Sequence, residues 1–176
     1  MANPETFAAI TGNPRNPSAP GHRTRSWLAL ISFCLLCVAG GAASGLVAPP
    51  GAWYQSLVKP NWTPPPWLFG PVWTVLYLMI GVAGWMIWSG RKSPRGRAAF
   101  GLFALQLVLN FAWTPIFFGL HAPGPAFAVI SALVACIAGT IVVTWRTERA
   151  ASLLLIPYAA WVCFASALNF ALWRMN

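Results

Sequence analysis

The sequence predicts an all-α integral membrane protein built as a five-transmembrane-helix bundle. Only 7% of its 176 residues are charged, whereas 58% are hydrophobic. A soluble domain carries roughly 25% charged residues, so this chain cannot cover a water-facing surface. Its uncharged residues form long runs, each able to cross a hydrocarbon core of about 30 Å as a helix. The runs do not alternate as membrane strands do. In lipid a chain must pair its own backbone groups, which favours helices.

The predicted elements follow in order along the chain. Residues 1–26 contain four prolines and few apolar side chains, which predicts a flexible N-terminal tail. The first span, 27–48, is too long for a signal-peptide core and no small-residue cleavage site ends it, so we expect it to be retained. The remaining spans are predicted at 67–89, 98–120, 122–145 and 150–173. Residues 27–176 therefore form one membrane domain.

Basic residues predict the orientation. With five spans, the tail, the second loop and the fourth loop share one side, and they carry nine Lys and Arg residues: Arg15, Arg23, Arg25, Arg91, Lys92, Arg95, Arg97, Arg146 and Arg149. The other side carries two, Lys59 and Arg174. Basic residues favour the cytoplasm, so the N-terminus is predicted to be cytoplasmic, with the first loop and the C-terminus on the opposite side. This distribution also accounts for the charge of +9 without a nucleic-acid partner, which would need a soluble basic face.

Titratable side chains are missing from the predicted spans. The two acids, Glu5 and Glu148, lie outside them, and the spans hold no Lys, Arg or His. Ion-coupled transporters use such groups at membrane depth, and acid–base catalysis needs them as well. No sequence cluster offers three metal ligands. We therefore expect no metal site and no required cofactor, and the pair Cys34 and Cys37 is interpreted as small hydrophobic residues.

The eleven tryptophans exceed what an interfacial aromatic belt requires. On the second span, aromatic and glycine residues share one helical face, and its two glycines could leave a hollow for a flat ring: Trp73, Tyr77, Gly81, Gly84 and Trp88. Similar faces occur on the third span, with Asn110, Trp113 and Phe117, and on the fifth, with Tyr158, Trp161, Ala165 and Leu168. These faces fit either the walls of a ligand pocket or ordinary packing of helices through small residues.

The first loop favours the pocket. Residues 49–66 are rich in Pro and Trp and contain a single charge, Lys59. Proline restricts the backbone, so such a loop can be rigid without regular structure. We expect it to act as a lid over one end of the bundle.

Three separated patterns resemble the translocator protein family, also called tryptophan-rich sensory protein or peripheral-type benzodiazepine receptor. They are Trp53-Tyr54-x-x-Leu57-x-Lys59-Pro60-x-Trp62, Gln106-Leu107-x-Leu109-Asn110-x-Ala112-Trp113 and Pro157-Tyr158-x-Ala160-Trp161. The resemblance covers about residues 27 to 176 and implies five transmembrane helices around a ligand pocket closed by the first loop. Members of this family bind porphyrins, including protoporphyrin IX and haem, and also benzodiazepine-type drugs; several bind cholesterol. A porphyrin or another flat hydrophobic small molecule is therefore the expected ligand.

The resemblance also implies roles for individual residues. Tyr54 and Pro64 match lid residues, Asn110 and Trp113 match polar and aromatic pocket positions, and Ala165 matches a small residue that affects ligand binding. Trp73 and Trp161 match a pair tied to porphyrin degradation. Leu168 and Arg174 match the ends of a proposed sterol motif whose central Tyr is Phe170 here, which removes a hydroxyl donor. The shared helical faces add Tyr77, Phe117, Tyr158 and Leu168 to the predicted ligand-binding set. Lys59 joins them because the propionates of a porphyrin need cations or N–H donors.

Several function classes follow from these features. The first is a membrane-embedded binding, sensing or carrier protein for tetrapyrroles, with a role in tetrapyrrole regulation or stress response. The alternatives are a light-dependent porphyrin-degrading enzyme that uses Trp73 and Trp161, and a sterol or lipid translocator. The expected partners are membrane lipid and a second copy of the chain. Small residues from Gly41 to Gly45 permit close helix approach, either inside the monomer or across a homodimer, and we predict a homodimer.

Overall fold

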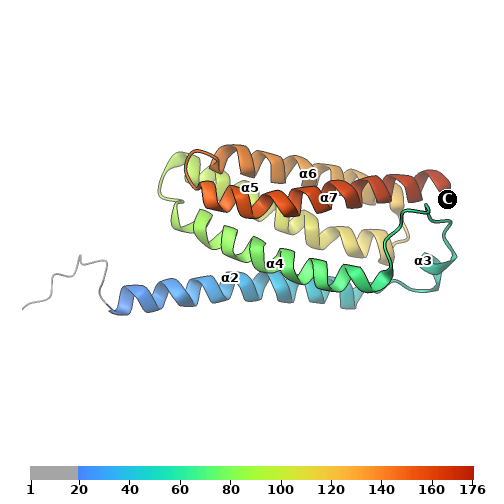
Figure 1. Ribbon diagram of the computed structural model, residues 1–176, viewed down its shortest axis with the longest axis horizontal. Helices are drawn as coiled ribbons and strands as arrows, with labels where there is room; N and C mark the ends of the chain where they lie inside the picture. Colours follow the sequence, from blue (N-terminus) through green and yellow to red (C-terminus); the bar gives the residue numbers. More distant parts are fainter. Residues whose placement is uncertain (1–19) are drawn as a thin grey trace, which may run out of the picture.

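The computed structural model describes residues 20–176, with side chains from Ser26 onward. Its elements are α2 (Pro20–Val47), α3 (Ala52–Ser56), α4 (Pro66–Ser89), α5 (Pro94–Thr114), the π-helical turn η1 (Pro115–Gly119), α6 (Pro123–Thr144) and α7 (Arg149–Met175). Five helices are long and apolar enough to cross a membrane, and Figure 1 shows them side by side, with α3 and the C-terminus at one end. The predicted fold class is thus confirmed.

The first long helix starts earlier than its predicted span. α2 begins at Pro20, inside the segment assigned to the tail, although its apolar membrane-spanning part is Ser26–Val47. The tail prediction for residues 1–19 lies outside the described residues.

Proline sets the start of three long helices. α4, α5 and α6 begin at Pro66, Pro94 and Pro123, because proline has the φ of a first helical residue and lacks an N–H that would have no partner there. Before α5, the hydroxyl of Ser93 also accepts a hydrogen bond from the Gly96 N–H at 3.0 Å, as expected of an N-cap.

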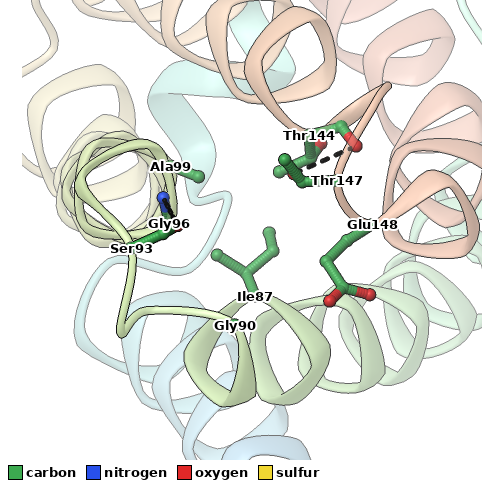
Figure 2. Close-up of a pocket in the computed structure, with 8 residues that line it drawn as sticks. All are labelled: Ile87, Gly90, Ser93, Gly96, Ala99, Thr144, Thr147 and Glu148. Atoms are coloured by element: carbon green, nitrogen blue, oxygen red, sulfur yellow. Dashed lines mark hydrogen bonds between the residues drawn. The ribbon is translucent and has the colours of Figure 1, made fainter.

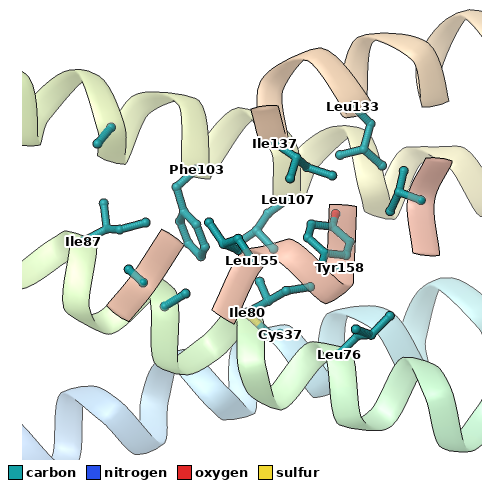
Figure 3. Close-up of a cluster of buried hydrophobic side chains, with 14 of the residues drawn as sticks. Cys37, Leu76, Ile80, Ile87, Phe103, Leu107, Leu133, Ile137, Leu155 and Tyr158 are labelled. Carbon is teal, nitrogen blue, oxygen red and sulfur yellow. The ribbon is translucent and has the colours of Figure 1, made fainter. Parts of the chain in front are cut away.

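The buried core lies where α4, α5, α6 and α7 meet, and Figure 3 shows part of it. It includes Ile80 from α4, Phe103 and Leu107 from α5, Ile137 from α6 and Leu155 from α7. α2 contributes little: only 6% of its apolar window is buried, compared with 33% for α4. Most of α2 therefore faces outward, toward the lipid of a membrane.

Gly81 and Gly84 of α4 do not form the expected hollow. A Cβ on Gly81 would stand 2.7 Å from Cα of Cys34 in α2, and a Cβ on Gly84 would meet the ring of Phe103 in α5. Both glycines are buried. The prediction of a ring-sized space on this face was wrong, because neighbouring helices approach closely at these positions and fill it.

The small residues of α2 also pack inside the monomer. A Cβ on Gly41 would meet the ring of Tyr77, and a Cβ on Gly40 would meet that of Phe111. The hydroxyl of Ser44 donates to the carbonyl oxygen of Phe111 at 2.9 Å. Gly45, by contrast, has nothing within 4 Å of a Cβ position. The pattern thus serves internal packing, and Gly45 is an open position within it.

Candidate functional site

The first loop closes one end of the bundle. Its side chains Trp53 and Tyr54, with Phe69 of α4, pack against a buried cluster formed by Phe117, Ala126, Leu168 and Leu172. The end of α7 holds the loop from the other side. The Val58 N–H donates to the side-chain oxygen of Asn176 at 2.9 Å, and the amide of Asn176 donates to the Val58 carbonyl at 3.1 Å. The geometry fits the predicted lid.

Aromatic rings fasten α3 to the bundle. The ring of Tyr54 meets that of Phe118 edge-on at 5.2 Å, and burial raises the pKa of the Tyr54 hydroxyl. The indole of Trp53 stacks on the imidazole of His121 at 4.4 Å. His121 adopts a φ of 51°, which few non-glycine residues adopt. The loop that follows η1 is therefore held in a constrained shape beneath the lid.

Lys59 is engaged within the lid itself. Its ammonium group donates to the carbonyl oxygens of Gln55 and Leu57, both at 3.1 Å, and lies 4.8 Å from the ring centre of Tyr54. Pro64 is half-buried in the same loop. The loop thus places a cation beside the aromatic cluster at the end of the bundle.

The polar centre of the predicted site is a chain of three side chains from three helices. The Tyr77 hydroxyl donates to the side-chain oxygen of Asn110 at 2.7 Å, and the Asn110 amide donates to the Tyr158 hydroxyl at 3.0 Å. Trp73 stacks on Tyr77 at 5.2 Å and lies 6.4 Å from the ring of Tyr158. The structure therefore brings these four predicted residues together.

A π-turn places the rings around Trp113. In η1 the Leu120 N–H donates to the carbonyl oxygen of Pro115 at 2.9 Å, so the turn holds one residue more than an α-helical turn. The ring of Phe117 stacks on that of Trp113 at 5.0 Å, and the ring of Phe118 meets it edge-on at 5.8 Å. The proline within an apolar run was the sequence signal for this distortion.

Asn169 is a buried polar residue that the predicted site did not include. Its side-chain oxygen accepts from the Trp113 indole N–H at 2.9 Å, and its amide donates to the Pro123 carbonyl at 2.8 Å. It is 1% exposed. Asn169 therefore links α7 to α5 and to the start of α6, and the Trp113 N–H already has a hydrogen-bond acceptor within the protein.

Trp161 is one of two tryptophans, with Trp85, whose indole nitrogen is buried without a hydrogen-bond partner in the described part of the chain. Its ring meets Phe69 at 5.8 Å and Phe164 at 5.4 Å. Because nearly all buried donors in folded proteins are paired, the Trp161 N–H is a candidate contact for a ligand. Ala165, on the next turn of α7, is half-buried and packs against the same core.

The three residues of the sterol pattern do not come together. Leu168 is buried under the lid, whereas Phe170 and Arg174 lie on the exposed surface of α7. The ring of Phe170 packs on Phe127 of α6 at 5.2 Å. Leu168 and Phe170 therefore lie in different surroundings, the first in the cluster under the lid and the second on the outer surface of α7.

Two cavities lie at the opposite end of the bundle from the lid. The smaller has a volume of about 30 Å³ and is lined by Ile87, Gly90, Ser93, Gly96, Ala99, Thr144, Thr147 and Glu148 (Figure 2). That is room for one or two water molecules. The larger, of about 260 Å³, is lined by Arg95, Ala98, Val142, Val143, Arg146 and Thr147. Neither is lined by a predicted site residue, and the aromatic rings of that site pack against one another.

Comparison with known proteins gives a consistent result. The model of the TspO/MBR family matches residues 33–174. The chain is 42% identical over 150 residues to the tryptophan-rich protein TspO of Chlorobaculum tepidum, which covers 83% of this chain and 95% of that protein. It is 38% identical over 151 residues to protein CrtK of Rhodobacter capsulatus, with 85% and 94% covered. It is also 38% identical over 154 residues to the translocator protein of Sus scrofa, with 85% and 91% covered.

Proposed function

This chain belongs to the TspO/MBR family and is a multi-pass membrane protein, and from that premise we propose that it binds tetrapyrroles or other flat hydrophobic ligands beneath its lid. The family's relatives carry the names translocator protein and tryptophan-rich sensory protein. The corresponding role here is that of a sensor or carrier whose ligand is protoporphyrin IX or haem.

One observation carries the proposal: Tyr77 of α4 and Tyr158 of α7 meet at the amide of Asn110, with Trp73 stacked on Tyr77, and a second aromatic group follows where Phe117 of η1 stacks on Trp113 of α5. A porphyrin is a wide flat π-system, and it can exchange the ring–ring contacts of these groups for ring–ligand contacts of the same kind. These rings pack against one another, so they must separate to admit such a ligand.

Polar groups at the site suit the edge of such a ligand. The N–H of Trp161, which has no partner among residues 26–176, offers a donor to a carbonyl or carboxylate oxygen. Lys59, in the lid, supplies a cation beside Tyr54. The interior of the site holds amide and hydroxyl groups but no charge, which favours a ligand whose charged groups are confined to one edge, as propionates are.

The Ala165→Thr variant tests the site. Ala165 is half-buried one turn from Trp161, so a branched side chain should intrude on a bound ring and weaken protoporphyrin IX binding by about 1–3 kcal/mol. Trp161→Ala should weaken binding as well, through lost stacking area. Affinity is measured by fluorescence titration, and melting temperature is measured on the same samples.

The matched control is Trp145→Phe, at the other end of the bundle, where the indole contacts Arg149. It should leave affinity unchanged. If the two site variants lose melting temperature but keep wild-type affinity, these residues only pack helices and the site lies elsewhere.

A light-dependent porphyrin-degrading activity is the second candidate. It is favoured by the stacking of Trp73 on Tyr77 at 5.2 Å, since an excited porphyrin beside this pair could take an electron from an indole, with dioxygen as the final oxidant. Illumination of the protein with protoporphyrin IX, repeated with Trp73→Phe and Trp161→Phe, separates the candidates. If the protein only binds porphyrin, the porphyrin absorbance should be lost under light no faster than it is without protein.

We also propose that the N-terminus is cytoplasmic and that the lid and the C-terminus lie on the opposite side. The connections α4–α5 and α6–α7, together with the first turns of α5 and α7, carry six basic residues at one end, and the lid end carries Lys59 and Arg174. A reporter fused after Asn176 should therefore be active on the non-cytoplasmic side. Cytoplasmic activity of that reporter would contradict the orientation.

The protein is further proposed to form a homodimer. Gly45 is an open small residue of α2, and the exposed side chains Leu46 and Val47 adjoin it. The expected mass in mild detergent and in lipid nanodiscs is that of two chains. A monomer in both environments would exclude the dimer.

A further inference from the structure

We propose that the groove between α5 and α6, at the basic end of the bundle, binds the headgroup of an anionic phospholipid. The groove has a volume of about 260 Å³ and is lined by Arg95 and Ala98 of α5, Val142 and Val143 of α6, and Arg146 and Thr147 of the following loop. It lies at the opposite end of the bundle from the lid and shares no residue with the tetrapyrrole site.

Charge supports an anionic occupant. Six basic side chains lie at this end, Arg91, Lys92, Arg95, Arg97, Arg146 and Arg149, with one acid, Glu148. The carboxylate of Glu148 is directed toward α4, where its Oε1 lies 3.3 Å from the Cβ position of Gly90 (Figure 2). It lines the small cavity instead of the groove, so the two groove arginines face no acidic side chain in the lining.

The other arginines at this end already have partners within the protein. Arg91 donates to the Trp88 carbonyl at 2.6 Å and covers the Trp88 ring at 3.8 Å. Arg97 donates to the Lys92 carbonyl at 3.2 Å, and Arg149 lies over the ring of Trp145 at 5.1 Å.

Arg95 and Arg146 differ from them. Both line the groove, and within residues 26–176 neither side chain makes a hydrogen bond, ion pair or ring contact. Their guanidinium donors remain available. A guanidinium group binds phosphate oxygens through two parallel N–H donors, which makes a phosphate the fitting partner.

The rest of the groove indicates that the phosphate belongs to a lipid. Its remaining lining is largely apolar, and Val142 is 74% exposed. Further along the helices the groove closes, because the Cβ position of Gly139 comes within 3.4 Å of Leu102. An apolar wall beside two cations, where α5 and α6 leave the membrane, matches the junction of headgroup and acyl chain. Basic pockets between membrane helices bind anionic lipid headgroups in this way.

The test uses the full chain in detergent, with phosphatidylglycerol and phosphatidylcholine as probes. Native mass spectrometry should show retained phosphatidylglycerol, and the melting temperature should rise with that lipid but not with phosphatidylcholine. In R95Q/R146Q, affinity for phosphatidylglycerol should fall about 30-fold, given a factor of about five for each basic residue near the surface. R95K/R146K keeps both charges but loses the paired N–H donors of guanidinium, so its affinity should fall between that of the wild type and that of R95Q/R146Q.

The matched control is R97Q/R149Q, which removes the same charge from the same end outside the groove. Its affinity should stay within about twofold of wild type if the site is local. Equal losses in the two double variants would overturn the proposal in favour of diffuse charge attraction, as would equal retention of phosphatidylcholine by the wild type. Displacement of phosphatidylglycerol by excess inorganic phosphate would show an anion site without lipid recognition and would also overturn it.

Discussion

Asn169→Leu is expected to lower the stability of the bundle by about 1–3 kcal/mol. The substitution leaves the indole N–H of Trp113 and the carbonyl oxygen of Pro123 without the partners they now find at 2.9 Å and 2.8 Å. A buried group that loses its partner costs about 1–3 kcal/mol. Single hydrogen bonds in membrane bundles are worth less, about 0.6 kcal/mol on average, but two are lost here at once. Unfolding in a detergent titration measures the change.

Gln106→Leu is the matched control, because Gln106 is also a buried helical amide. It is 0% exposed, and within the described residues neither its side-chain oxygen nor its nitrogen has a hydrogen-bond partner. Replacing an unpaired buried amide with an apolar side chain of similar size should leave stability unchanged or raise it. If the two substitutions had equal effects, the paired state of the Asn169 amide would contribute nothing.

Gly81→Ala should destabilise the contact between α2 and α4 by about 1–3 kcal/mol. The new methyl group would stand 2.7 Å from Cα of Cys34. Because this neighbour is backbone, α2 must shift as a whole. The same change at Gly101 adds a Cβ with nothing within 4 Å, and a helical Gly→Ala exchange otherwise gains up to about 1 kcal/mol. Melting temperatures of the two variants should therefore move in opposite directions, and a parallel shift would contradict the close approach.

Span positions could be predicted from the sequence because a membrane imposes one length and one composition on every helix. The predicted limits 67–89 and 122–145 differ from α4 (Pro66–Ser89) and α6 (Pro123–Thr144) by a residue at most. α5 begins at Pro94 rather than at residue 98. The predicted span started later because an apolar run cannot include Arg95 and Arg97, whereas a helix capped by Ser93 can.

Side-chain partners could be predicted only in part. Helical spacing placed Tyr77, Asn110 and Tyr158 on inward faces, and the structure joins all three. Helical spacing does not say which neighbouring helix fills the space beside a glycine. Gly81 and Gly84 were therefore predicted to leave a hollow, although Cys34 and Phe103 occupy that space. Nor does helical spacing reveal that Asn169, rather than a ligand, receives the Trp113 N–H, because that pairing depends on how three elements meet in space.

The π-turn of η1 bears on how the length of this chain can change during evolution. Its bond from the Leu120 N–H to the Pro115 carbonyl encloses one residue more than an α-helical turn would. Deleting one residue here would restore α-helical geometry and alter only the short connection to α6. A deletion earlier in α5 would rotate every later side chain of the helix by about 100°, turning Asn110 and Trp113 away from their partners. Insertions and deletions among related sequences should therefore be found mainly at residues 115–119 and be rare in the preceding span.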